Sequence, residues 1–161
     1  MSIKEVFLQQ FSALNAEKNW TVTMENALKG LTFEQAMKKD SAAHSIHEIV
    51  NHLIYWNGMQ IKMFNGTFNP VHTPDNESTF IDEKKYSEEK WRESVNKILE
   101  LFSEWVRVIE NSDDSKFESD FRGDPFYSFL ANVTIHNAYH IGQIVLIRKQ
   151  NGNWDSKLGV K

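Results

Sequence analysis

Two histidines stand four residues apart in an apolar stretch of the chain, in the segment His136-Asn137-Ala138-Tyr139-His140. An α-helix has about 3.6 residues per turn, so side chains at positions i and i+4 lie on one face, one turn apart. Two imidazoles placed in this way can hold a divalent metal ion if a third ligand joins them. The spacing is that of the zinc-protease pattern H-E-x-x-H, but Asn137 stands where that pattern has its catalytic glutamate. The sequence therefore argues against peptide hydrolysis by that route.

A third histidine, His52, lies in another apolar helical stripe, between Ile49 and Trp56. A buried imidazole without a hydrogen-bond partner costs roughly 1–3 kcal/mol, and one metal ion would satisfy all three rings. Three protein ligands leave coordination positions open for water or substrate, which is typical of catalytic rather than structural sites. We therefore predict a metal site formed by His52, His136 and His140. The alternative is that each is a core histidine satisfied by ordinary hydrogen bonds.

The other three histidines are predicted to lie outside this site. His44 and His47 fall at the start of the helix that carries His52, and His72 falls in a connection. His47 precedes His52 by five residues, which places it about 140° away around the helix. We expect surface or helix-capping roles for all three, with Ser41 or His44 as the cap of that helix.

Four segments have apolar residues at alternating spacings of three and four, which is typical of helices that pack in a bundle. The expected helices run from about Ile3 to Ala16, from Ser45 to Asn65, from Ser87 for about 24 residues, and from Pro125 to Gln150. The residues expected to face the core include Gln10, Trp56, Met59, Val95, Phe129, His136, His140, Gln143 and Ile147. No segment alternates as a strand does, so no sheet is expected. The predicted fold class is all-α, a single four-helix-bundle domain over residues 1–161 with long crossover connections.

The connections between these helices are uneven in length. Residues 17–44 are expected to hold short helical pieces, at Met24–Lys29 and after Thr32, which starts a capping-box pattern. Residues 66–86 are expected to form a long surface crossover, and residues 111–124 a loop. Connections of this length suit a bundle that is not simply up-down-up-down.

Three residues mark expected helix ends. Ser87 is a candidate N-cap, because acidic residues follow it in the first turn. Pro125 suits the first position of the last helix, where a missing N–H does no harm. Gly152 is a candidate stop after Gln150.

The composition excludes several classes of protein. Lys and Arg number 18 against 22 Asp and Glu, so the formal charge is 18 − 22 = −4, with no basic block that would favour nucleic acid. The chain has no Cys, which rules out disulfides, thiolate ligands and a cysteine nucleophile. Met1–Glu5 lacks the pattern of a signal peptide, and no apolar run reaches the ~18 residues that span a membrane. We expect a soluble cytoplasmic protein with no membrane partner.

Two segments resemble the motifs of a known family. The segment from His44 to Trp56, with His52 inside it, resembles the first motif of the DinB-like proteins (the DinB/YfiT superfamily), a group of candidate metalloenzymes. The segment from His136 to Ile144 resembles the second motif, H-x-x-x-H-x-G-Q, including Gly142 and Gln143. The resemblance covers essentially the whole chain and implies a four-helix bundle, a homodimer, and a three-histidine metal site whose ligands would be His52, His136 and His140. Two departures stand out: His47 replaces a frequent Trp, and the tail after Trp154 is short and polar.

The resemblance also implies a type of reaction. Relatives include enzymes that transfer a low-molecular-weight thiol to an electrophile, and we take this as the leading hypothesis for a small-molecule substrate. Zn is the expected metal, with Ni, Mn or Fe as alternatives, and the thiol would be an external cosubstrate because the chain has no Cys. Gln143 and Tyr139 are candidates for orienting substrate or water, and Glu48 and Asn132 are candidate groups near the ligands. Trp56 and Met59 are expected to pack beside the site.

Two alternatives stay open at this point. One is a metal-dependent hydrolase that uses metal-bound hydroxide. The other is not enzymatic: a metal-binding or sensing bundle, or a metal-free helical dimer.

Overall fold

The computed structural model describes residues 1–17, 19–39, 44–72, 74–81 and 86–160. Four long helices run side by side: α1 (Ile3–Asn15), α4 (Ile46–Phe64), α5 (Glu88–Glu110) and α7 (Phe126–Gln150). Around the bundle, α1 and α4 each lie against both α5 and α7, so that α5 and α7 occupy opposite corners. The shorter elements are α2 (Met24–Leu28), α3 (Phe33–Met37), η1 (Glu77–Phe80), α6 (Ser115–Glu118), β1 (Asp120–Phe121), β2 (Asp124–Pro125) and η2 (Ser156–Leu158).

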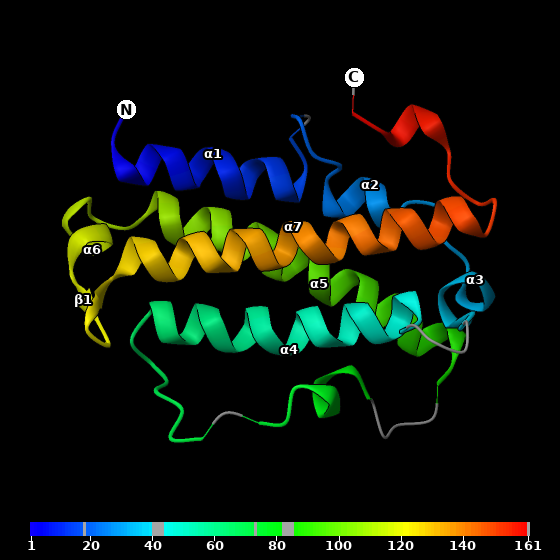
Figure 1. Cartoon of the computed structure of the whole chain (residues 1–161), viewed down its shortest axis with the longest axis horizontal. Helices are drawn as coiled ribbons and strands as arrows, with labels where there is room; N and C mark the ends of the chain where they lie inside the picture. The colour runs from blue at the N-terminus through cyan, green and yellow to red at the C-terminus, as the bar shows by residue number, and fades with distance from the viewer. Residues whose placement is uncertain (18, 40–43, 73, 82–85, 161) are drawn as a thin grey trace.

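The order of helix directions explains the long connections (Figure 1). Helices α1 and α7 run from left to right in this view, and α4 and α5 run from right to left. Because the consecutive helices α4 and α5 are parallel neighbours, the chain must return along the whole length of the bundle between them. The crossover after α4 makes this return, and η1 within it packs against α4. The prediction of an all-α bundle with long crossovers is confirmed.

The residues that cap the helices agree with the predictions in two places and differ from them in two others. Ser87 accepts a hydrogen bond from the backbone N–H of Lys90, and Gly152, with φ +69°, follows the end of α7. The cap of α4 is Ser45, whose side chain and that of Glu48 form a capping box. His44 is therefore not the cap, and Ser41 lies outside the described residues. Pro125 is the N-cap of α7, one position before the expected one.

The core has two apolar parts with a polar layer between them. One part packs around Trp91 and Phe102, and the other around Trp105 and Phe64. Between them along α4 and α7 lie Asn57 and Asn137, both fully buried. Each amide donates to the other's carbonyl oxygen at 2.9 Å, and the indole of Trp105 donates to the Asn57 oxygen at 2.8 Å. Asn137 therefore belongs to the core on the side of α7 that faces inward.

Two expectations about the fold were wrong. Residues 111–124, predicted to be a loop, contain the short helix α6 and the strand β1, which pairs with β2 at Asp124–Pro125 in a small antiparallel sheet. Their turn residues, Arg122 and Gly123, both have positive φ, 60° and 92°, as the tight type I′ hairpin requires. Arg-Gly is not one of the usual signals for that turn, which is why the sequence did not reveal it.

The inward faces of α1, α4 and α7 are also rotated from the predicted ones, and in α5 only Val95 departs from the prediction. In α1, Gln10 is exposed and Phe11 is in the core. Of the other residues expected to face inward, several are only half-buried: Trp56, Met59, Val95, Phe129, His136, Gln143 and Ile147. The core face of α7 instead contains Leu130, Val133, Asn137, Ile141 and Ile144. The predicted faces of α4 and α7 thus lie at the border between core and solvent.

Candidate metal centre

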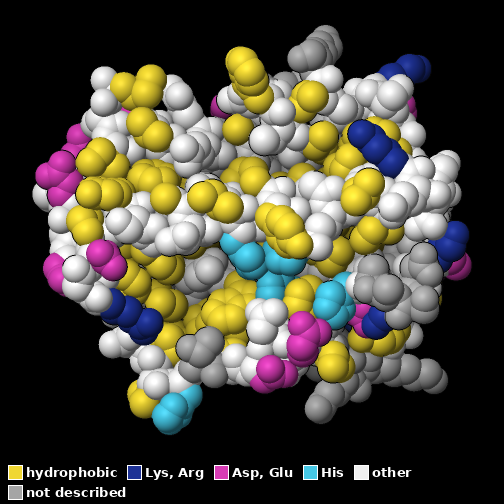
Figure 2. Space-filling model, viewed as in Figure 1, with side chains coloured by type: hydrophobic (Ala, Val, Ile, Leu, Met, Phe, Trp, Pro, Cys, Tyr) yellow, Lys and Arg dark blue, Asp and Glu magenta, His cyan; other side chains and the backbone are white. Residues whose placement is uncertain are grey.

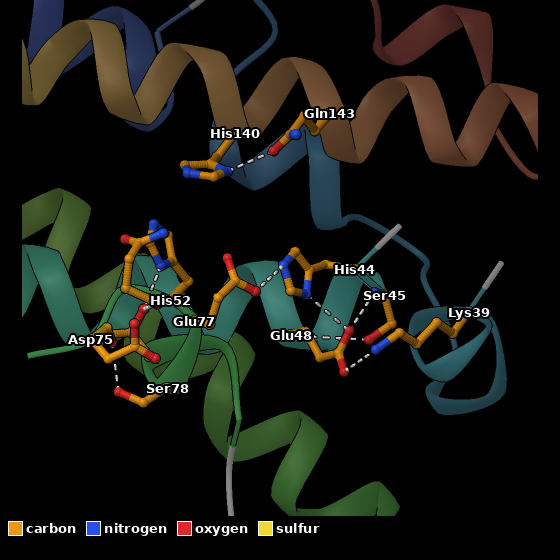
Figure 3. Close-up of polar contacts among 12 residues, drawn as sticks. Lys39, His44, Ser45, Glu48, His52, Asp75, Glu77, Ser78, His140 and Gln143 are labelled. Carbon is orange, nitrogen blue, oxygen red and sulfur yellow. Dashed lines mark hydrogen bonds and ion pairs between the residues drawn. The ribbon is translucent and has the colours of Figure 1, made fainter. Parts of the chain in front are cut away.

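The three predicted ligands meet between α4 and α7. His52 projects from α4, and His136 and His140 project from α7 one turn apart. Nε2 of His136 lies 3.0 Å from Nε2 of His52 and 3.1 Å from Nε2 of His140. One nitrogen from each ring can be chosen so that all three lie within 4.8 Å of one another. Figure 3 shows His140 on α7 pointing across the gap toward His52 on α4.

The hydrogen bonds on the far side of His52 determine its tautomer. Its Nδ1 lies 2.6 Å from Oγ1 of Thr79, and the same hydroxyl lies 2.6 Å from the carbonyl oxygen of Asn76. A carbonyl oxygen cannot donate, so the single hydroxyl proton must lie between Thr79 and Asn76. The Thr79 oxygen therefore accepts a hydrogen bond from Nδ1–H of His52. Nε2 of His52 then has a lone pair directed at the other two rings.

His140 is supported in the same way from its own helix. Its Nδ1 donates to the Gln143 carbonyl oxygen at 2.6 Å, which leaves a lone pair on Nε2. The Gln143 amide nitrogen donates in turn to the Tyr139 hydroxyl at 3.1 Å. Nδ1 of His136 is buried without a hydrogen-bond partner among the described residues. Two of the three rings are thus held with Nε2 ready to bind a metal ion.

Burial favours the neutral form of all three rings. Removal from water, with smaller effects of the neighbouring His140 and His136, lowers the pKa of His52 to about 3. The pKa of His140 is lowered to about 4, first by burial and then by His136, against a smaller opposing effect of Gln143. Burial also lowers the pKa of His136. Neutral imidazole is the form that binds divalent metals, so the surroundings favour metal ligation.

The residues fit a divalent ion in both geometry and hydrogen bonding. Nitrogens about 2.1 Å from one ion and 90–110° apart are separated by roughly 3.0–3.4 Å, and two pairs here are 3.0 and 3.1 Å apart. Nε2 of His52 and Nε2 of His140 each direct a lone pair at Nε2 of His136. Without a cation, Nε2 of His136 could offer at most one proton, which can satisfy only one of these two lone pairs. A cation would meet this shortage, because each lone pair could then face a positive charge.

The site opens on one face of the molecule. In Figure 2, histidine side chains gather at a hollow between the ridge formed by α7 and the region of α4 and the crossover. The ring of Phe80 in η1 lies between two histidines, stacked 4.0 Å from His52 and 3.8 Å from His44. Trp56 meets the edge of His52 with ring centres 6.3 Å apart, which agrees with the expectation that it packs beside the site. The half-buried His136 and the exposed Tyr139 lie on the open side.

The remaining histidines occupy three different environments. His47 does not join the cluster, as expected, but it is buried against Trp91 and is no surface residue, so that expectation was wrong. His44 is half-buried, with its nitrogens 3.4 Å from carboxylate oxygens of Glu48 and Glu77 (Figure 3). His72 is exposed, as predicted.

The other two candidate residues, Glu48 and Asn132, hydrogen-bond to groups outside the cluster. Glu48 hydrogen-bonds to Lys39 and to the backbone of Ser45, so it serves the start of α4. Asn132 is exposed and donates to the Ser128 carbonyl in its own helix. Sequence reasoning missed Thr79 and Phe80 altogether, because the crossover has no periodic pattern that would mark buried residues.

The comparison with family models gives one match. The model of the DinB superfamily matches residues 16–144, the greater part of the chain. The matched range contains both segments with the three candidate ligands, and the chain belongs to the DinB superfamily. Comparisons with curated proteins and with solved structures each gave no match.

Proposed function

We propose that this chain is a divalent-metal-dependent enzyme that transfers a low-molecular-weight thiol to a small electrophile. The observation that carries the proposal is the convergence of three neutral imidazoles, two of them with Nε2 freed by hydrogen bonds at Nδ1. His52, His136 and His140 would hold the ion, with Zn as the expected metal. When bound, such an ion lowers the pKa of a coordinated thiol and holds it as a thiolate.

Among the described residues, Tyr139 is our candidate for orienting a substrate. Its oxygen accepts from Gln143, so its own O–H proton remains available as a donor, and the side chain is 61% exposed. Gln143 holds both Tyr139 and His140, which links the orientation of a bound molecule to that of a ligand. We propose that Gln143 acts through these two side chains and that Tyr139 contacts the substrate directly.

Thiol transfer is proposed over hydrolysis because the cluster has no carboxylate base beside it. Among the described residues no carboxylate oxygen joins the three histidines, so a metal-bound water would have no carboxylate to take its proton or to protonate a leaving group. A thiol is a far stronger acid than water, so a metal-bound thiolate forms with less help from a base. The chain itself contains no Cys, so an external thiol would not compete with an internal one.

The experiment compares thiol-dependent and thiol-independent reaction of the Zn-loaded protein. The probes are glutathione and cysteine, each with a chromogenic aryl halide. In the expected reaction the sulfur bonds to the ring carbon, halide leaves with the bonding electrons, and the thiol proton passes to solvent. We expect product only with thiol, and loss of at least ~100-fold in rate for His136→Ala, beyond the ~10–100-fold typical of an outer partner of a metal ligand.

Other outcomes would replace this proposal. Hydrolysis of an activated ester by the wild type without thiol, lost in His136→Ala, would favour the hydrolase. Stoichiometric Zn with neither activity would favour a metal-binding or sensing bundle. A protein purified without a His tag that binds no Zn or Ni would remove the metal site itself.

We also propose that the chain forms a homodimer through the outward face of α7. Residues 126–147 include no Asp, Glu, Lys or Arg, yet Ile135, Tyr139 and Leu146 are exposed there. A groove of about 400 Å³ between α1 and α7 continues this face to Trp20, which is 92% exposed. Together these side chains expose on the order of 500 Å² of largely apolar surface, at the upper end for a monomer and not far below one side of a standard interface.

A second copy of the chain is the partner that the charges favour. In Figure 2 most of the Lys, Arg, Asp and Glu side chains lie at the edges and in the lower part of the face that α7 crosses, and basic side chains also appear at its upper right. Each copy has a net charge of −4, so two copies repel each other overall, and a surface without charges is where they can meet with little added repulsion. The described residues include no helix long and apolar enough to span a membrane.

A further inference from the structure

The crossover between α4 and α5 reaches the metal centre through η1. Of the described residues, Thr79 is the only one outside α4 and α7 that hydrogen-bonds to a ligating ring. It is buried, and its hydroxyl donates on the other side to the carbonyl of Asn76, the N-cap residue of η1. The crossover thus supplies a fixed acceptor to His52.

This acceptor selects one of two forms of the ring. A neutral histidine carries its proton on Nδ1 or on Nε2, and in water the two forms are close in energy. Since the Thr79 proton is committed to Asn76, only Nδ1–H of His52 can complete the contact of 2.6 Å. The form with Nε2–H would set two lone pairs against each other at Nδ1 and would block Nε2.

Packing holds the ring at the same place. The His52 and Phe80 rings are nearly parallel, with an angle of 12° between them, and the next ring in the stack is His44, at 5° to Phe80. The His52 ring therefore cannot turn its plane without displacing Phe80. Thr79 and Phe80 are adjacent in η1, so one short segment controls both the tautomer and the orientation of the ligand.

We propose that Thr79 is a positioning residue of the metal centre, and that residues 74–81 of the crossover are part of that centre rather than a connection alone. The inference rests on the proposed metal binding by the three histidines. It assigns different support to each ligand: His52 is held by the crossover, His140 by Gln143 in its own helix, and His136 by no side chain among those described.

The test uses Thr79→Val, which keeps the shape of the side chain and removes its hydroxyl. In metal-free protein, ¹⁵N NMR of the ring nitrogens should show Nδ1–H for His52 in the wild type and a shift toward Nε2–H in Thr79→Val. The Kd for Zn, from competition with a chromophoric chelator, should rise by about 10–100-fold, the usual effect of losing such a partner. Thr79→Ser restores the hydroxyl and should bind within about 3-fold of wild type.

Thr134→Val is the matched control. Thr134 is also buried, and its hydroxyl donates only to the Ala131 carbonyl in its own helix, so both readouts should stay as in the wild type. If Thr79→Val does not fold, Thr79→Ala replaces it with the same expectations.

Three results overturn or separate the claims. An unchanged His52 tautomer in Thr79→Val overturns the inference, whether or not Zn binds more weakly, because the loss would then have another cause. A changed tautomer with Zn affinity within 3-fold of wild type overturns the claim that Thr79 serves the metal centre. A wild type that binds no Zn refutes the proposed function, while the NMR comparison still decides whether Thr79 sets the tautomer.

Discussion

Helices α5 and α7 have nearly the same length, 23 and 25 residues, and lie at opposite corners of the bundle. Ten residues of α5 are charged, and all its exposed positions are polar or charged. In α7 the only charged residues are Arg148 and Lys149, in the last turn, and the exposed positions before them include Ile135, Tyr139 and Leu146. One helix therefore has a single face directed at the core, and the other has apolar residues all around.

This difference indicates that the two helices need different numbers of packing partners. A helix that is apolar on one side only needs one set of packing partners, which the bundle provides for α5. A helix that is apolar all around needs partners on every side. Helix α7 contacts the core with one side, carries two candidate metal ligands on a second, and exposes an uncharged third side for which we propose a second copy of the chain.

The largest expected effect comes from placing charge on that third side. We expect the wild type to sediment as a dimer of the 18.8 kDa chain and Ile135→Lys/Leu146→Lys as a monomer at micromolar concentration. Each lysine would be buried without a partner, at a cost of several kcal/mol, which corresponds to more than ~1000-fold in the dimer Kd. Sedimentation velocity over a range of concentrations measures this directly.

The matched control places the same charges on α5. Asn96→Lys/Ser103→Lys adds two lysines at exposed positions of the charged face and should leave the dimer unchanged. A monomeric wild type, or a dimer that survives the α7 substitutions, would contradict the interface. If both double variants weaken the dimer equally, net charge rather than the face of α7 controls association.

A smaller effect, on the stability of the fold, is expected inside the bundle. There Asn57 of α4 hydrogen-bonds to both Asn137 of α7 and Trp105 of α5. Asn137→Ala removes both hydrogen bonds to Asn57 and leaves a cavity in a fully buried layer. We expect a loss of about 2–3 kcal/mol in the free energy of unfolding, from urea denaturation of the metal-free protein. Asn132→Ala, on the exposed side of the same helix, should change it by less than ~0.5 kcal/mol. Similar values for the two variants would mean that the buried amide pair contributes no net stability.

The same contrast explains which parts of the fold were predictable. The inward face of α5 was predicted nearly completely, from Trp91 to Ile109, because charged residues mark the opposite side. In α7 no such marker exists: Ile135 is 68% exposed and Ile141 is 3% exposed, although they are the same residue type in the same helix. Periodicity alone therefore placed the face of α7 about one position away from the true one.

The candidate metal site shows a similar division between local and distant information. His136 and His140 were found from their spacing, and His52 from its place in a helical stripe, because helix geometry fixes these relations locally. The error in the face of α7 placed His136 in the core, whereas it is half-buried, while His52 and His140 are buried. Thr79 could not be found, since its contact with His52 joins residues 27 apart through a crossover without a regular pattern.

The smallest expected effect concerns how the two helices begin. The Ser87 hydroxyl accepts from the Lys90 backbone N–H at the start of α5, whereas α7 has no side-chain cap and the N–H of Phe126 donates to the Ser119 carbonyl. Ser87→Ala should therefore cost about 1 kcal/mol of unfolding free energy in urea denaturation. Ser119→Ala leaves the backbone carbonyl in place, and its own hydroxyl donates only to the nearby Lys116 carbonyl, so it should cost less than ~0.5 kcal/mol. A larger cost at Ser119 than at Ser87 would show that the start of α7 depends on that side chain after all, and that the two helices do not differ at this end.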